Sequence, residues 1–228
     1  MATSPSFKKA TALPSLIAFG SQTVWPTSEY LFQLRAAIIL EPRLRTFLTA
    51  IKELPRLWQE LVLHDPRLNA VPGQAYMKDL VEWVNHGEFQ SVTGVPPNVL
   101  TTPFTIIIHI IQYFHYLDSL QCDHATVLES LKHGGAQGFC TGMLSAIAVA
   151  CSENEDDVND LGVVALKLAL CIGAYVDLDG QYADETNETT SIAVRWRSGG
   201  GHDKVMEILK RFPEVTILNQ GISAQVPG

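Results

Sequence analysis

A glycine-flanked cysteine motif places the strongest constraint on how this chain can fold. Gly138 to Gly142 reads Gly-Phe-Cys-Thr-Gly and stands directly before the apolar run Met143 to Ala150. Glycines two residues to either side of a cysteine, just ahead of a helix, are typical of a nucleophile elbow, a sharp turn with room only for small neighbours. The N–H groups and positive dipole end of such a helix favour the nucleophilic thiolate of Cys140. The motif therefore predicts acyl transfer through a thioester on Cys140.

A tetrahedral oxyanion beside Cys140 would need two N–H donors. We expect the backbone N–H of Thr141, directly after the nucleophile, to be one of them. The other must come from a separate loop after an early strand, and the loop Gly20 to Thr23 is placed to supply it through Gln22. Two simpler interpretations stay open, namely a buried core cysteine at position 140 and a plain turn at the loop.

Hydrophobic periodicity predicts an α/β order of elements. Strands are expected at 15–19 and 134–138, and two more at 192–196 and 215–218. Helices are expected at 31–40, 44–63, 77–84, 103–120, 143–150, 161–176 and 205–212, with interruptions at Pro42 and Pro55 and an acidic loop at 153–160.

Charge and composition exclude some classes of function. The chain has 228 residues, 46% of them hydrophobic, and a net charge of −8. Residues 1–100 carry 9 basic and 8 acidic side chains, whereas residues 101–228 carry 7 and 16, so nucleic acid is not an expected partner. The chain shows no secretory leader pattern, and its most apolar run, Phe104 to Ile111, is too short to span a bilayer, so no membrane partner is expected.

The cysteines and acidic residues do not form metal-binding patterns. Four cysteines lie far apart without a Cys-x-x-Cys pair, which favours reduced thiols in a cytoplasmic protein over a zinc site. The acidic stretch 153–160 lacks the alternating oxygen ligands and central glycine of a calcium-binding loop. No metal is expected. The cysteines are Cys122, Cys140, Cys151 and Cys171.

Five short segments follow one another in a characteristic order: 19–23, 111–113, 138–142, 171–177 and 193–196. Together, over essentially the whole chain, they resemble the starter unit:acyl carrier protein transacylase domain of fungal non-reducing polyketide synthases. The resemblance implies one such domain over residues 1–228, with a malonyl/acyl transferase-like core of the α/β-hydrolase type. It also implies a ferredoxin-like subdomain that begins near residue 190 and is incomplete at Gly228.

The same resemblance implies a reaction and its participants. An acyl group would pass from acyl-CoA, or from a fatty acid synthase, to the nucleophile Cys140. It would then pass to the phosphopantetheine thiol of an acyl carrier protein and so prime polyketide synthesis. Gln22 matches the glutamine of the family's oxyanion loop. No bound cofactor is implied.

One position departs from the pattern of malonyl-specific relatives. In those proteins an arginine on the helix after the elbow holds the malonyl carboxylate, and our alignment places Cys171 or its neighbours there. No arginine lies between Cys140 and Arg195, and Lys167 is expected to be a surface residue. The departure implies a neutral acyl group, such as acetyl or a longer alkanoyl group.

The general base is a second departure. A cysteine transacylase needs a base for the thiol proton, and the family's histidine is expected further downstream than Gly228. His202 does not match it, His109 and His115 are expected to be satisfied core residues, and His133 is expected to point away from the sulfur. Three interpretations stay open: an acyltransferase, a truncated and catalytically impaired protein that binds a carrier protein or synthase, and a cysteine hydrolase.

Overall fold

Two short strands from distant parts of the chain pair in parallel. In the computed structural model, β1 (Ile17–Phe19) lies beside β2 (Ala136–Gly138), with Ile17 opposite Ala136 and Phe19 opposite Gly138. The backbone N–H of Phe139 donates to the carbonyl of Phe19 over 2.9 Å. The carboxyl ends of the two strands, where the predicted loop and elbow follow, therefore lie side by side.

Helices form most of the described chain, which comprises residues 13–21, 25–87, 89, 96–182 and 200–211. Two short 3-10 turns, Pro42–Leu44 and Pro66–Ala70, lie before and after the helix Arg45–His64. The helices are α1 (Ser28–Leu40), α2 (Arg45–His64), α3 (Gly73–His86), α4 (Asn98–Leu120), α5 (His124–Ser130), α6 (Gly142–Ala150), α7 (Glu155–Tyr182) and α8 (Gly200–Leu209).

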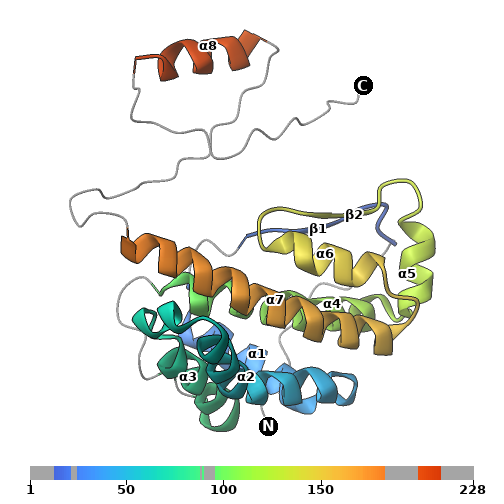
Figure 1. Cartoon of the computed structure of the whole chain (residues 1–228). Coiled ribbons are helices and arrows are strands. Elements are labelled where there is room, and N and C mark those ends of the chain that lie inside the picture. Colours follow the sequence, from blue (N-terminus) through green and yellow to red (C-terminus); the bar gives the residue numbers. More distant parts are fainter. Residues whose placement is uncertain (1–12, 22–24, 88, 90–95, 183–199, 212–228) are drawn as a thin grey trace. The chain divides into compact units, whose positions relative to one another are not determined.

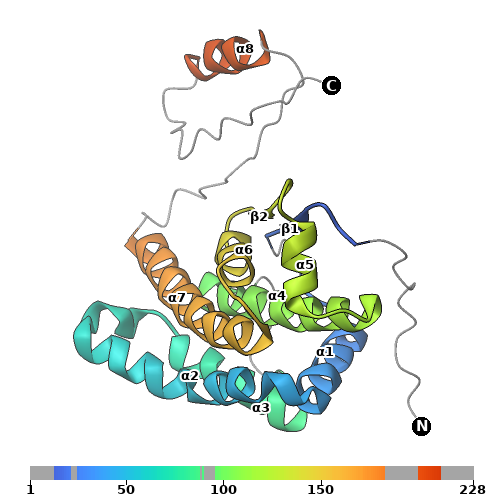
Figure 2. The ribbon, with the colours of Figure 1, turned by 90° about the vertical axis from the view of Figure 1, so that its right-hand side faces the viewer.

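The chain divides into two compact units, residues 1–184 and 185–228. In the first unit, α4 and α7 lie side by side in the middle, with β1, β2 and α6 on one side and α1, α2 and α3 on the other (Figures 1 and 2). The buried apolar side chains form one continuous core around α4. This helix is buried on nearly all sides, as its apolar sequence predicts.

The N-terminus of α4 is fixed to the end of α7. The carboxylate of Asp177 accepts hydrogen bonds from the backbone N–H groups of Asn98 and Val99, over 3.0 and 2.7 Å. These are two of the N–H groups that a helix leaves unpaired at its start. The two helices also approach closely, since a Cβ on Gly173 would stand 2.3 Å from the Asn98 carbonyl oxygen and from Oγ1 of Thr102. The central pair is thus held by both a cap and a close contact.

The prediction of an α/β protein is confirmed in a general sense, because the described chain is mostly helical with a small two-stranded parallel sheet. Two details of the helix prediction are wrong. α4 begins at Asn98, ahead of Pro103, and α2 continues through Pro55. Proline costs a helix interior about 3 kcal/mol, whereas each large apolar side chain that is buried contributes about 1.5–3 kcal/mol. The buried stripe that keeps α2 intact is Phe47, Ile51, Leu54 and Trp58.

The predicted acidic loop at 153–160 is also wrong, because α7 begins within it. Glu155, Asp156 and Asp157 form the first turn of α7, where negative charge interacts favourably with the helix dipole. The side-chain oxygen of Asn154 accepts a hydrogen bond from the backbone N–H of Asp157 over 3.0 Å and caps this turn. An acidic cluster after a polar cap residue is a helix start in this chain.

In the second unit, the predicted helix at 205–212 corresponds to α8, which starts earlier, at Gly200. The predicted strands at 192–196 and 215–218, and the expected boundary near residue 190, lie outside the described residues. Among the described helices, α7 alone is long and apolar enough to cross a bilayer by length and composition. A core helix passes the same test, and α7 packs against α4, α2 and α6.

Candidate active site

Cys140 stands at a strained turn between β2 and α6. Its φ of +55° lies in the left-handed region, which costs a residue with a side chain about 1–2 kcal/mol. Among the described residues other than glycine, only Gln121 shares this feature. The cysteine is exposed. The strand, turn and helix therefore have the backbone arrangement that the glycine motif predicts.

The two flanking glycines explain how the turn closes. A Cβ on Gly142 would stand 2.2 Å from the carbonyl oxygen of Phe19, and one on Gly138 would stand 2.3 Å from Cα of Met143. Real Cβ atoms do not approach backbone atoms so closely. Both positions require glycine because the elbow presses against the end of β1 on one side and against its own helix on the other.

The amide of Thr141 is a candidate donor at this turn. The N–H groups that follow it are engaged: Met143 donates to the Cys140 carbonyl over 3.0 Å and Leu144 donates to the Thr141 carbonyl over 3.1 Å. Between residues that the structure describes, no hydrogen bond is donated by the backbone N–H of Thr141. The thiol Sγ of Cys140 lies 3.8 Å from Oγ1 of Thr141. An N–H next to the sulfur and near the start of α6 can bind a developing negative charge.

Gln22 lies outside the described residues, but both ends of its loop are described. At the near end, the ring of Phe19 lies 5.3 Å from the imidazole of His109 on α4. At the far end, the Trp25 ring stacks on Phe104, also on α4, at 5.0 Å, and meets the edge of Phe89 at 5.2 Å. α4 therefore anchors the loop on both sides.

His109 is a hydrogen-bonded core residue, as the sequence predicts. Its Nδ1 lies 2.9 Å from Oγ of Ser145 on α6, and Ser145 is buried. Burial lowers the pKa of His109 to about 4, so the ring is neutral at physiological pH. Sequence reasoning missed its partner Ser145, because no spacing rule links a residue on one helix to a residue on another helix distant in the chain.

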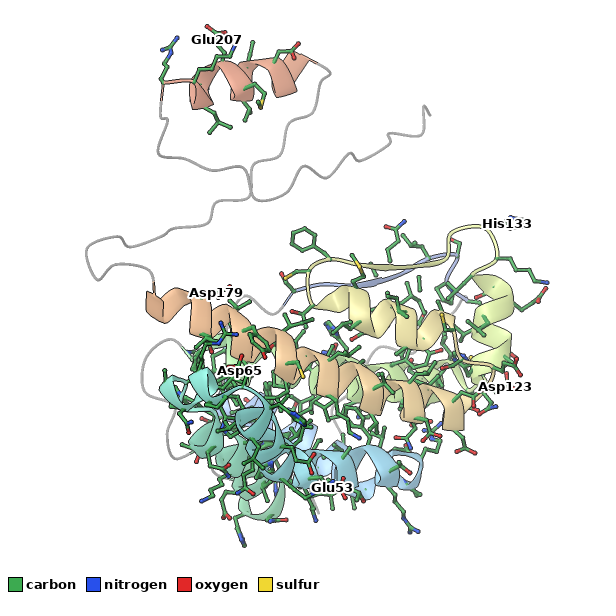
Figure 3. All side chains as sticks on the ribbon, in the orientation of Figure 1. Glu53, Asp65, Asp123, His133, Asp179 and Glu207 are labelled. Atoms are coloured by element: carbon green, nitrogen blue, oxygen red, sulfur yellow. The ribbon has the colours of Figure 1, made fainter. Side chains whose placement is uncertain are left out.

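The remaining predicted residues lie away from the sulfur or outside the description. Figure 3 shows His133 pointing outward at the turn between α5 and β2, and its side chain is exposed. Lys167 is exposed on α7, which confirms the prediction of a surface lysine. Cys171 on the same helix is partly buried, and burial raises the pKa of its thiol. The side chain of His202 lies outside the described residues.

Apolar side chains on one face of α6 lead away from the elbow. Met143 and Ile147 stand four residues apart on α6 and are 55% and 52% exposed, and Phe139, on the turn before the helix, is 65% exposed. Three exposed residues with the same spacing lie on α7, which packs against α6. They are Val164, Leu168 and Ile172. Exposed apolar patches on soluble proteins often mark binding surfaces.

Known proteins are similar to this chain over nearly all of its length. A family model described as "Starter unit:ACP transacylase in aflatoxin biosynthesis" matches residues 17–223, which include β1 and the elbow. Non-reducing polyketide synthases of Penicillium shearii, Aspergillus fumigatus and Emericella nidulans are 42%, 40% and 40% identical to the chain. The matches cover 90%, 91% and 93% of this chain and 9%, 12% and 8% of those proteins.

The chain thus spans about a tenth of the length of these relatives. The family match runs through the elbow and both strands, and the relatives align over nearly all of the chain. The segments that carried the resemblance in the sequence lie within the matched range. The chain therefore belongs to the starter unit:ACP transacylase family.

Proposed function

We propose that this chain is an acyltransferase domain that transfers a starter acyl group through a thioester on Cys140 in polyketide biosynthesis. The donor is acyl-CoA or a fatty acid synthase, and the acceptor is the phosphopantetheine thiol of an acyl carrier protein. The observation that carries the proposal is the backbone of Cys140, whose φ of +55° presents an exposed thiol at the start of α6. The family match supports the assignment of transacylation to this thiol.

The proposed reaction has two steps of the same kind. The thiolate of Cys140 attacks the acyl-CoA carbonyl and forms a tetrahedral oxyanion. The oxyanion collapses, the thiolate of CoA leaves, and the acyl group stays on Cys140 as a thioester. The thiol of the carrier protein then attacks the new thioester and releases Cys140. In both steps the oxyanion would accept hydrogen bonds from the N–H of Thr141 and from the loop of Gln22.

The acyl group is proposed to be neutral. The exposed side chains of Phe139, directly before Cys140, and of Met143 and Ile147 on α6 are apolar. On α7, the position aligned with the malonyl-binding arginine falls at or near the partly buried Cys171, and Lys167 is exposed. Acetyl or longer alkanoyl groups fit such a surface better than a malonyl carboxylate, which would need a paired cation.

Intact-protein mass spectrometry after incubation with acetyl-, hexanoyl- and malonyl-CoA tests the proposal. We expect one acyl adduct on the wild type, a weaker one with malonyl-CoA, and none on Cys140→Ala. Cys151→Ala is the matched control, because Cys151 is also exposed and ends the same helix. An adduct retained on Cys140→Ala would overturn the assignment. Free acid without transfer to a carrier protein would identify a cysteine hydrolase instead.

A second candidate is a domain that binds a carrier protein or synthase without turnover. It is favoured by one observation: the hydrogen bond of the Cys140 thiol is to Thr141, whereas His109 is bound to Ser145 and His133 points outward. A folded wild-type protein that forms no adduct but retains an immobilised acyl carrier protein would support this candidate. Loss of both properties would reject both candidates.

Two broader expectations accompany the proposed activity. The family resemblance implies an α/β-hydrolase-type core around the two strands, and an experimental structure of the chain joined to the downstream part of a synthase would test it. The four cysteines are all free, which fits a reducing compartment such as the cytoplasm.

A further inference from the structure

The imidazole of His109 contacts both β1 and α6, the two elements next to the proposed oxyanion donors. One contact is with the ring of Phe19 at the end of β1, whose centroid lies 5.3 Å from the centroid of the imidazole. The other is with Oγ of Ser145, 2.9 Å from Nδ1, on the second turn of α6. The loop of Gln22 follows the first contact, and the nucleophile precedes the second.

Backbone contacts also connect β1 to the elbow. The N–H of Phe139 donates to the Phe19 carbonyl over 2.9 Å. Gly142 lies so close to that carbonyl oxygen that a Cβ would stand 2.2 Å from it. Phe19 therefore meets the elbow through its backbone and His109 through its ring, and His109 meets α6 through Ser145. These contacts join β1, the elbow, α6 and α4 in a closed loop.

A neutral, hydrogen-bonded imidazole suits this place between two packed segments. Burial is the cause that lowers the pKa of His109, so the ring carries no charge that would need a counterion. The planar ring packs against Phe19 while a ring nitrogen bonds the serine. A purely apolar side chain would leave the buried hydroxyl of Ser145 without this partner, which is costly.

Oxyanion stabilisation depends on the distance between donors that come from different segments. The amide of Thr141 and the loop of Gln22 are far apart in sequence, so only tertiary contacts set their separation. A misplacement of about 1 Å can reduce a rate by about 10²-fold. A side chain that fixes the end of β1 against α6 would therefore control catalysis without touching the substrate.

We propose that His109 is a positioning residue, which holds the end of β1 and the first turns of α6 in the register that the oxyanion site needs. The inference rests on the proposed transacylation, and it adds a residue outside the Gly-x-Cys-x-Gly motif on which the rate of that reaction depends. His109 takes no proton from Cys140 in this proposal. It affects the positions of the two proposed oxyanion donors, the N–H of Thr141 and the loop of Gln22.

The test separates oxyanion chemistry from thiol reactivity. The variants are His109→Phe, which keeps a ring but loses the hydrogen bond, Ser145→Ala, and the double variant. For each, the rate of acylation by hexanoyl-CoA is compared with the rate of Cys140 alkylation by iodoacetamide, which forms no oxyanion. We expect acylation to fall by roughly 10- to 100-fold and alkylation to stay within about twofold. The double variant should match the single variants, since they remove one shared bond.

Tyr113→Phe is the matched control. Tyr113 lies one turn further along α4, and its hydroxyl makes a buried 2.6 Å hydrogen bond to Nδ1 of His124, on α5 and away from the elbow. This variant should leave the ratio of the two rates unchanged. Equal losses in acylation and alkylation, or the same change in ratio for Tyr113→Phe, would overturn the proposal and leave His109 with a structural role.

Hydrogen exchange keeps the inference testable apart from activity. If the wild-type chain forms no acyl adduct, the proposed function fails while the positioning contact can still be judged. His109→Phe should then raise amide exchange in peptides that cover residues 17–21 and 138–145, whereas Tyr113→Phe should not. Unchanged exchange in both segments would overturn the positioning role on its own.

Discussion

At Cys140, an exposed thiol and a strained backbone coincide. The left-handed conformation disfavours any side chain, yet the chain places a cysteine there rather than glycine or asparagine. Strain of this kind persists where the surrounding structure enforces it, and here the enforcing contacts are those of Gly138 and Gly142. The elbow therefore exchanges some stability for an exposed thiol at the helix start.

Removal of that strain should stabilise the fold. We expect Cys140→Gly to be more stable than Cys140→Ala by up to about 1 kcal/mol, because glycine adopts a positive φ without a Cβ penalty. Urea unfolding measures the difference. At Cys151, where φ is −95°, the order should reverse and alanine should be the more stable replacement. An alanine variant that equals or exceeds the glycine variant at position 140 would contradict the claim of strain.

Among the elements, the unit of β2, the elbow and α6 depends on backbone contacts more than on side chains. Gly138→Ala and Gly142→Ala should each destabilise the chain by at least about 2 kcal/mol, because the new methyl group would overlap backbone atoms that cannot move independently. Thermal or urea unfolding gives the value.

Gly20→Ala is the control for these two variants. Gly20 follows β1 directly, and apart from its chain neighbours no heavy atom of the described residues lies within 4 Å of the position of its Cβ. Its substitution should change the free energy of unfolding by less than about 0.5 kcal/mol. A cost at Gly20 as large as that at Gly142 would show that the close approach to Phe19 is not what demands glycine.

Local sequence patterns could predict the elements that are determined by residues close together in the chain. The glycine motif specified the turn at Cys140, and the short apolar run before Gly20 specified β1, because a sharp turn and a buried strand leave their marks on neighbouring residues. α5 is absent from the sequence prediction because its seven residues are too few to show a clear apolar period. Its one local signal is the N-cap Asp123, which accepts from the N–H of Thr126 over 2.8 Å.

The features that were mispredicted or missed depend on tertiary contacts. Pro55 stays within α2 because buried neighbours hold the helix together. The hydrogen bond between His109 and Ser145 joins α4 to α6, and both α5 and β2 lie between these helices in the sequence, so no local pattern of residues predicts it. In the candidate site, the sequence could predict a nucleophile at Cys140 and an N–H donor at Thr141, but not the contact of His109 with Ser145 that lies behind them.

For the whole molecule, the pH dependence of stability is a measurable property to which the partly buried His109 contributes. The unfolded chain binds a proton at His109 near the ordinary pKa of 6.5, whereas the native ring does so only near 4. Between these values the unfolded state binds more protons, so stability falls as the pH falls from 7 towards 4. The shift corresponds to a loss on the order of 3 kcal/mol.

Comparison of wild type with His109→Phe isolates this contribution. The recorded partners of the imidazole, the Phe19 ring and the Ser145 hydroxyl, are uncharged. Between pH 7 and pH 4.5, wild type should lose roughly 2 kcal/mol more stability than the variant in urea unfolding, while Tyr113→Phe should follow wild type. Parallel loss in wild type and His109→Phe would mean that the imidazole takes up its proton in the folded state as easily as in the unfolded chain.

The parallel pairing of β1 with β2 has a consequence for how the chain folds during its own synthesis on the ribosome. β1 is synthesised before its partner strand, Ala136–Gly138, which leaves the ribosome only after α1 to α5 have been synthesised. Closing so long a loop costs entropy that later contacts must offset. A nascent chain therefore carries an unpaired strand through most of the synthesis of this region, and the thiol acquires its surroundings only when α6 emerges and folds onto both strands.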